Sequence, residues 1–265
     1  NGVIDKWSKA GVKGWRLDVV DELPIDFTNK LCSRIKSEGE DMLVVGEVWE
    51  DASIKIAYSE WRPYFMGEQL DSVMNYPFKE AILAYALTGD KNAFISDVTT
   101  ILEHYPKQSL DVLMNLVDSH DTARAITVLS GVKPPYSKKD RADFALSCEQ
   151  YDLAKRRLKL ASALQYTLPG VPCVFYGDEV GKQGYEDPLN RGTYPWGRED
   201  TDLLAHYRKL GELRHTFATY LQGETHFVPD PDKLVFERVC MGGVLRVESQ
   251  GLWLSISVNG KSQLK

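Results

Sequence analysis

The feature that most constrains the fold of this chain is a repeated alternation of short apolar strands with amphipathic helices. The expected strands are 12–19, 42–46, 70–74, 112–117 and 172–176. The expected helices are 3–10, 25–37, 78–87, 91–105, 150–167 and 203–214. Strands that alternate with helices in this way are typical of a parallel α/β sheet.

Five strand–helix units do not close a (β/α)8 barrel, which needs eight strands and about 250 residues. The sequence therefore indicates the later portion of such a barrel, in a fold that opens before Asn1. Beyond the helices the pattern changes to short strands with polar or Gly-containing turns, at 234–239, 243–247 and 252–258. We expect residues 1–216 to be the C-terminal part of a catalytic barrel and 217–265 the start of a small antiparallel β-domain.

Composition excludes several functional classes. The net charge of −6 and the absence of a basic stripe argue against a nucleic-acid partner. No apolar run approaches the roughly 20 residues of a membrane span, and we expect a cytoplasmic protein. The cysteines show no Cys-x-x-Cys spacing, which predicts buried free thiols in place of a zinc site or a disulfide framework; they are Cys32, Cys148, Cys173 and Cys240.

Polar residues end three of the apolar strands. Arg16 and Asp18 share one face of the first strand, because strand side chains alternate with a period of two. Glu47 ends the second strand, and the run His120-Asp121 follows the fourth. The carboxyl ends of parallel barrel strands form the active-site mouth, so the three carboxylates are expected to gather there.

Three carboxylates at one mouth favour glycoside hydrolysis with retention, which needs an ionised nucleophile and a protonated acid. Arg16 beside Asp18 favours a charged carboxylate, which suits Asp18 as the nucleophile. Glu47, close to two other carboxylates, is expected to retain a proton that it can donate. Asp121 then supports the oxocarbenium-like transition state, with His120 bound to the same sugar. The alternative is that each is an ordinary strand-end charge that is solvated or caps a helix, and the three together argue against it.

These residues lie in segments that resemble the α-amylase superfamily of glycoside hydrolases. Gly14-Trp-Arg-Leu-Asp-Val, Val45-Gly-Glu-Val-Trp and Ser119-His-Asp-Thr-Ala-Arg are similar to its nucleophile, acid/base and stabiliser segments, in the family's order. Leu70-Asp-Ser-Val-Met-Asn-Tyr-Pro-Phe resembles the sixth strand of the neopullulanase, cyclomaltodextrinase and maltogenic amylase group. Pro169-Gly-Val-Pro-Cys-Val-Phe-Tyr-Gly-Asp-Glu-Val-Gly resembles the eighth strand and its loop.

The resemblance implies barrel strands 4–8 and double displacement on α-1,4 glucosidic bonds, with α-1,6 bonds as a further candidate. Its substrates would be maltooligosaccharides, cyclodextrins, pullulan or starch. Two alternatives stay open: a sucrose- or trehalose-directed member of the superfamily, and an isolated barrel fragment without activity of its own. The family's first signature, an Asp and a His near the third strand, has no counterpart here. The resemblance also implies a missing N-terminal part that can form a homodimer.

The remaining site residues follow from the resemblance or from side-chain chemistry. Asp187 and Arg191 match family residues that contact glucose on the non-reducing side. Trp49 and Tyr76 are candidates to stack on a sugar face, and with Arg16 and His120 they complete the predicted binding set. Asp178-Glu179 is interpreted as stabilising its loop, and Trp61, Tyr64 and Phe65 as packing within a loop helix. No cofactor and no metal site is predicted in this segment; the calcium sites of amylases draw on the missing part.

Overall fold

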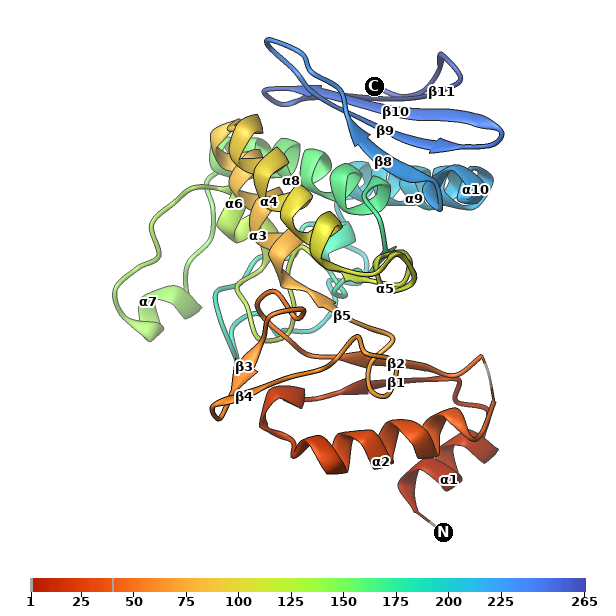
Figure 1. The fold of residues 1–265 in the computed structure, drawn as a ribbon. Helices are drawn as coiled ribbons and strands as arrows, with labels where there is room; N and C mark the ends of the chain where they lie inside the picture. The colour runs from red at the N-terminus through yellow and green to blue at the C-terminus, as the bar shows by residue number, and fades with distance from the viewer. Residues whose placement is uncertain (1, 40) are drawn as a thin grey trace.

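The computed structural model describes residues 2–39 and 41–265, in which helices pack beside a five-stranded parallel sheet and along one side of a five-stranded antiparallel sheet (Figure 1). The first sheet is parallel in the order β1-β2-β5-β6-β7, and the second is antiparallel in the order β12-β11-β10-β9-β8. Strands of the first sheet are β1 (Gly14–Leu17), β2 (Leu43–Gly46), β5 (Ser72–Asn75), β6 (Met114–Asn115) and β7 (Val171–Pro172). Consecutive strands are neighbours and parallel, so the prediction of barrel strands 4–8 followed by a small all-β domain is confirmed.

Helices connect these strands, and five of the ten described α-helices begin at a polar side-chain cap. They are α1 (Val3–Lys9), α2 (Ile25–Lys36), α3 (Tyr76–Thr88), α4 (Lys91–His104), α5 (Lys107–Asp111), α6 (Ala125–Leu129), α7 (Lys138–Ala142), α8 (Cys148–Thr167), α9 (Thr201–Thr216) and α10 (Ala218–Leu221). The Ser147 hydroxyl accepts a hydrogen bond from the Gln150 amide, whose side chain returns to the Ser147 N–H. The Asp200 carboxylate caps α9 by accepting hydrogen bonds from the backbone N–H groups of Asp202 and Leu203. Helix starts are therefore fixed by local chemistry.

The core lies between the parallel sheet and the helices α3, α4, α8 and α9. Phe78 and Ile82 of α3 are fully buried, as are Leu158 and Leu164 of α8. Each such side chain contributes about 1.5–3 kcal/mol through burial. α3 contacts both α4 and α8, and α8 contacts α9, so the layer is continuous in Figure 1. This layer holds the strand ends that carry the polar residues.

Strands β6 and β7 are shorter than predicted, because side-chain amides replace part of the backbone ladder. Asn75 Nδ2 donates to Asn115 Oδ1 at 2.8 Å, and Asn115 Nδ2 donates to the Pro169 carbonyl at 2.8 Å. Gly170, at φ 110°, lies so close that an added Cβ would stand 2.7 Å from the Leu113 oxygen. The predicted strand 172–176 thus ends at Pro172.

The prediction of buried thiols is correct for Cys32 and wrong for Cys148 and Cys173, which are exposed, while Cys240 is partly buried. Cys173 follows β7, which is the edge of the parallel sheet, and no described strand covers that edge. Cys148 is the first residue of α8, where side chains point to solvent. The apolar neighbours of Cys173 in the sequence predict a buried thiol, but its position beside an edge strand leaves it exposed.

Between β2 and β5 the expected loop helix is wrong. The segment instead forms a two-stranded antiparallel hairpin of β3 (Ile56–Ala57) and β4 (Glu60–Trp61). Tyr64 is buried as predicted for packing, and its hydroxyl donates to Asp21 Oδ1 at 2.6 Å. Lys55 Nζ lies 3.0 Å from the other Asp21 oxygen. Asp21 therefore ties the segment after β1 to the segment after β2.

The antiparallel sheet has two strands more than predicted. Its strands are β8 (Glu224–Phe227), β9 (Leu234–Cys240), β10 (Gly243–Gln250), β11 (Trp253–Val258) and β12 (Lys261–Leu264). The outer strands β8 and β12 alternate little in hydrophobicity, so period-two analysis misses them. Arg238 of β9 is fully buried and donates to the carbonyls of Thr167, Leu221 and Gly223. Burial lowers the pKa of this guanidinium to about 10.

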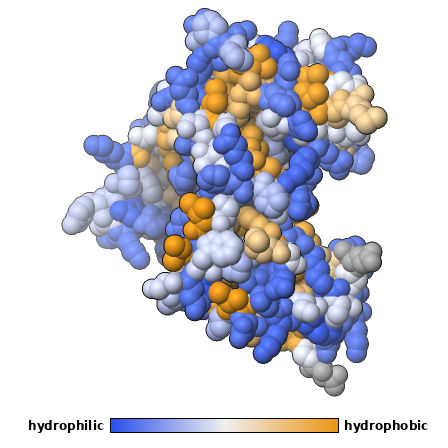
Figure 2. All heavy atoms as spheres, viewed as in Figure 1, coloured by the Kyte–Doolittle hydropathy of each residue, from blue (hydrophilic) through white to orange (hydrophobic). Residues whose placement is uncertain are grey.

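On the face drawn in Figure 2, apolar side chains form separate patches among hydrophilic ones. The outline is hollowed between the part that carries α1 and α2 and the part that carries the other helices and the antiparallel sheet (Figures 1 and 2). Within residues 2–39 and 41–265, no helix is long and apolar enough to cross a membrane.

The buried Arg238 predicts a large stability difference between two arginines of the same sheet. Arg238→Met should lower the free energy of unfolding by about 2–4 kcal/mol, because three buried carbonyls lose their donor. Arg246→Met is the control: Arg246 pairs with Glu237 and Glu248 in a partly exposed position, and its loss should cost less than about 1 kcal/mol. Urea unfolding of both variants measures the difference, and equal costs would contradict it.

Candidate active site

The three predicted carboxylates lie at the same edge of the parallel sheet. Asp18 follows the last residue of β1, and Glu47 follows the last residue of β2. Leu17 pairs with Gly46 in the ladder, so these two carboxylates leave their strands at the same level. Asp121 stands in the loop after β6. Parallel pairing through β5 brings that loop to the same edge of the sheet.

Arg16 contacts both Asp18 and Glu47. Its Nη1 pairs with Asp18 Oδ1, and its Nη2 lies 2.9 Å from Glu47 Oε2. The Asp18 side chain is 70% exposed, whereas that of Glu47 is 8% exposed. The guanidinium therefore contacts both carboxylates, whereas the sequence predicted a contact with Asp18 alone. Exposure distinguishes the two, because the Asp18 carboxylate is open to a ligand, whereas the Glu47 carboxylate is enclosed.

Two hydrogen-bond donors hold Glu47 in addition to its ion pair with Arg16. Besides Arg16, the Val19 N–H donates to its Oε2 at 3.0 Å, and the Trp49 indole N–H donates to its Oε1 at 3.1 Å. Val19 has φ 47°, a left-handed conformation that is costly for a β-branched residue. This strained turn aims the Val19 N–H at Glu47. The acid candidate is therefore oriented by the segment that carries Asp18.

Trp49 and Tyr76 form one wall of the site. Their rings are stacked, with centroids 4.3 Å apart and planes at 10°. Trp49 is 45% exposed, while Tyr76 is buried, and its hydroxyl lies 3.2 Å from Ser119 Oγ. Burial raises the pKa of Tyr76, which keeps its hydroxyl neutral. A contact chain thus runs from Glu47 through both rings to the loop that bears Asp121.

His120, Asp121, Asp187 and Arg191 form a second polar group. His120 Nε2 lies 3.0 Å from Asp121 Oδ2, and Arg191 Nη2 lies 3.5 Å from Asp121 Oδ1. Arg191 also pairs with Asp187 at 2.7 Å. All four side chains are partly exposed, so their polar atoms remain accessible to a ligand. Every residue of the predicted set is therefore found in one of two connected groups.

Sequence reasoning missed the buried charges behind Asp121. Arg124 is fully buried; its Nη1 lies 3.1 Å from Asp178 Oδ1, and its guanidinium stacks on Phe175 with its central carbon 3.8 Å from the ring centre. Burial raises the pKa of both Asp118 and Asp178. The oxygens without another partner are Asp118 Oδ1 and Asp178 Oδ2, and one shared proton between them satisfies both. Arg124 closes the quoted Ser-His-Asp-Thr-Ala-Arg run, so its position was visible and its burial was not.

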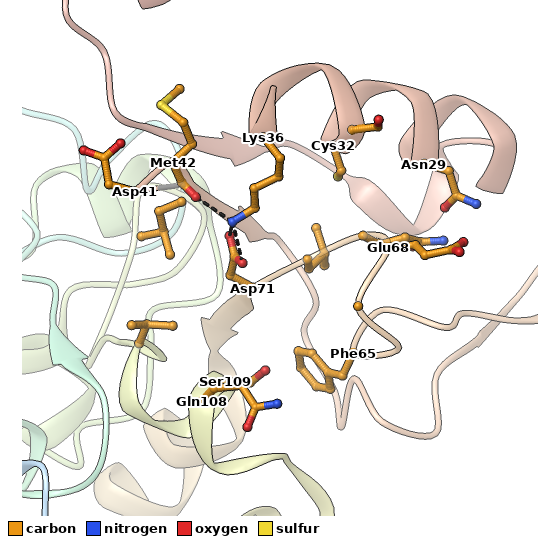
Figure 3. Close-up of a pocket in the computed structure, with 16 residues that line it drawn as sticks. Asn29, Cys32, Lys36, Asp41, Met42, Phe65, Glu68, Asp71, Gln108 and Ser109 are labelled. Carbon is orange, nitrogen blue, oxygen red and sulfur yellow. Dashed lines mark hydrogen bonds and ion pairs between the residues drawn. The ribbon is translucent and has the colours of Figure 1, made fainter. Parts of the chain in front are cut away.

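A polar cavity of about 730 Å³ lies at the opposite end of the strands (Figure 3). Lys36 of α2 spans it, donating to the Met42 carbonyl at 2.6 Å and to both Asp71 oxygens at 2.7 Å. Its other wall carries Phe65 and Ser109. The cavity lies between α2, the segment that precedes β5, and α5. None of the predicted site residues lines it, so it is separate from the carboxylates.

In residues 2–39 and 41–265, no group of three or more His, Cys, Asp and Glu side chains is arranged to hold a metal ion. Asp178 and Glu179 do not form a common site: Asp178 pairs with Arg124, while Glu179 accepts a hydrogen bond from the Gly177 N–H. The two residues stabilise their loop from opposite sides.

Comparisons with known proteins agree with this geometry. Residues 1–210 match the family described as alpha amylase, catalytic domain. The chain is 36% identical over 218 residues to an amylopullulanase of Thermoanaerobacter thermohydrosulfuricus, which covers 78% of this chain and 14% of that protein. It is 35% identical over 224 residues to a cyclomaltodextrinase of a Bacillus species, which covers 83% of this chain and 35% of that protein.

Among solved structures, the cyclic α-maltosyl-(1→6)-maltose hydrolase from Arthrobacter globiformis superposes with a TM-score of 0.76 at 25% identity. The superposition covers 93% of this chain and 50% of that one. The fold and the strand-end carboxylates define a portion of a (β/α)8 glycosidase barrel. The chain belongs to the α-amylase family, and the predicted similarity to its cyclomaltodextrinase and neopullulanase group is confirmed. It spans between 14% and 35% of the length of the two curated relatives.

The shared proton predicts opposite effects for two replacements of Asp178. Asp178→Asn should change the free energy of unfolding at pH 7 by less than about 1 kcal/mol, because an amide mimics the protonated carboxyl towards Asp118. Asp178→Leu should lower it by about 3 kcal/mol, because Arg124 loses a buried partner. Urea unfolding compares the two, and an Asn variant as unstable as the Leu variant would rule out the shared proton.

Proposed function

We propose that this chain carries the catalytic residues of a retaining glycoside hydrolase that acts on α-1,4 glucosidic bonds, with α-1,6 bonds as a second linkage. The observation that carries the proposal is the linked pair Asp18 and Glu47 at the ends of adjacent parallel strands, joined by Arg16. Two carboxyl groups held together at a barrel mouth match the requirement of double displacement.

In the first step, an Asp18 oxygen attacks the anomeric carbon while the bond to the leaving oxygen breaks. Glu47 gives its proton to that oxygen, so the leaving sugar departs as an alcohol. In the second step, Glu47 takes a proton from water, the water oxygen bonds to the anomeric carbon, and the bond to Asp18 breaks. Two inversions give net retention of configuration.

The geometry suits these roles. The exposed Asp18 carboxylate can reach a sugar carbon and is oriented by its ion pair with Arg16. The Glu47 carboxyl is enclosed, and the Trp49 and Val19 donors fix its orientation. Asp121, with His120, is placed to bind sugar hydroxyls as positive charge develops on the ring.

Sugar contacts are assigned to the exposed parts of both groups. One face of Trp49 is covered by Tyr76, which leaves its exposed part as a stacking surface for a pyranose ring. Arg191 and Asp187 offer a donor and an acceptor beside Asp121. The printed names of the relatives support an α-glucan substrate, since they include amylopullulanase and cyclomaltodextrinase.

The open sheet edges support a larger barrel. Among the described residues, β1 and β7 each lack a partner on one side. We propose that strands from outside this chain pair with both edges and complete the substrate cleft, that a homodimer forms through that part, and that the protein works in the cytoplasm without a cofactor. We also propose a domain boundary after residue 216, where α9 ends. By this proposal, the 265-residue chain alone releases no sugar from maltotetraose.

The catalytic assignment predicts the behaviour of three variants of the full-length protein. Asp18→Asn, Glu47→Gln and Asp121→Asn should each lower kcat on maltotetraose by about 10³-fold or more, because each removes a group that acts in the transition state. Glu50→Gln is the matched control, because Glu50 is an exposed carboxylate three residues from Glu47 that pairs with Lys55.

Rates are measured with a substrate panel that also contains γ-cyclodextrin, pullulan, sucrose and trehalose, and the first-formed anomer is read by NMR. The α-anomer is expected. A Glu47→Gln variant with near-normal turnover, or a β-anomer as first product, would overturn the proposal. Hydrolysis of sucrose or trehalose alone would redirect it to another substrate class.

A further inference from the structure

Asn190 lies beneath the loop that carries Asp121. It is fully buried, and its side-chain nitrogen is 2.8 Å from the His120 carbonyl, 2.7 Å from the Thr122 carbonyl and 3.3 Å from the Ser119 carbonyl. These three carbonyls surround Asp121 in sequence. One amide thus holds the backbone on both sides of the proposed transition-state stabiliser.

The orientation of the Asn190 amide is fixed by chemistry. Its nitrogen faces three acceptors, so a rotated amide would place an oxygen against three carbonyl oxygens. The Asn190 Oδ1 is buried and has no hydrogen-bond partner among the residues that the structure describes. The residue therefore leaves one polar atom unsatisfied in order to bind this loop.

The backbone of Asn190 is anchored to the buried charge cluster. Arg124 Nε donates to the Asn190 carbonyl at 2.9 Å, and the Arg124 backbone N–H donates to the Gly184 carbonyl at 2.9 Å. Arg124 is itself held by Asp178 and by the Tyr176 carbonyl. The amide is thus attached to a rigid base built from the segment after β7.

The loop makes few other contacts that fix its backbone from outside. Within it, Thr122 Oγ1 accepts from the Ser119 N–H at 2.9 Å, and Ser119 Oγ accepts from the Asp121 N–H at 3.2 Å. From outside, Arg191 Nε donates to the His120 carbonyl at 3.1 Å, through a partly exposed side chain. The Tyr76 hydroxyl reaches the loop through the Ser119 side chain at 3.2 Å, whereas Asn190 is buried and contacts the loop backbone directly.

We propose that Asn190 is a positioning residue that sets the place of Asp121, a role that rests on the proposed function. Asn190 does not touch substrate. It fixes the loop so that the Asp121 carboxylate meets the sugar hydroxyls without rearranging as the transition state forms. Its removal should lower kcat more than it raises KM.

The experiment uses the full-length protein with maltotetraose at pH 7. Asn190→Asp keeps the shape but sets a carboxylate against three carbonyls, and kcat should fall about 30- to 100-fold with a change in KM below about threefold. In Asn190→Ser, which retains one donor, kcat should fall less than in Asn190→Asp. This second variant keeps the test valid if the Asp variant does not fold. Ser249→Ala is the control, because it removes a buried hydrogen bond between Ser249 of the antiparallel sheet and Tyr85 of α3. The kcat of this variant should stay unchanged.

A double variant distinguishes positioning from general damage. If Asn190 acts through Asp121, Asn190→Asp should add less than about threefold to the loss already caused by Asp121→Asn. Multiplied losses would overturn the proposal. Amide hydrogen exchange gives a readout that does not depend on turnover: the segment 118–124 should exchange faster in Asn190→Asp and not in Ser249→Ala. Unchanged exchange would also overturn it, whereas an inactive wild-type protein with faster exchange in the variant would count against the proposed function alone.

Discussion

The contact of one guanidinium with two carboxylates is the interaction on which the rest of the site depends. Arg16 pairs with Asp18 and with Glu47, and both carboxylates lie within reach only because β1 and β2 are parallel and in register. An antiparallel pair would place the strand ends at opposite edges of the sheet. The fold therefore supplies the alignment, and Arg16 supplies the charge that keeps two acids close together.

The site has two layers that differ in burial. The exposed layer contains Asp18, Asp121, His120 and Arg191, which remain accessible to a sugar. The buried layer behind it is held by Arg124 and by the carboxyl pair Asp118 and Asp178. Buried charges of this kind persist only when each is paired and hydrogen-bonded. The free-energy cost of burying these charges is consistent with a rigid support beneath the loop that carries Asp121.

Much of this arrangement could be predicted from the sequence, and the reasons are specific. The period-two spacing of Arg16 and Asp18 placed both on one face, and the apolar strand before Glu47 placed it at a strand end. The bounds of α2 and α4 were predicted within one residue, because their caps and apolar periodicity are local. The family was identified from three short segments whose order matched.

Other features could not be predicted because they depend on long-range contacts. The hairpin β3–β4 was missed, and so was the hydrogen bond from the nearby Tyr64 to Asp21, 43 residues away. The link from Arg16 to Glu47 was missed because strand pairing sets it. Asn190 lies between Asp187 and Arg191 of the predicted site, yet its three backbone acceptors lie about 70 residues earlier in the chain. Sequence spacing identifies residue types, whereas their partners follow from the tertiary fold.

The central claim is that Asp18 forms a covalent bond with the sugar, and trapping that bond tests it most directly. The full-length Glu47→Gln variant is incubated with α-maltosyl fluoride, whose fluoride leaves without a proton and whose covalent product then lacks a base to activate water. Peptic peptides are analysed by mass spectrometry at low pH. The account predicts a maltosyl group on Asp18; a label on any other carboxylate, or an unlabelled protein that still releases maltose with inverted configuration, would contradict it.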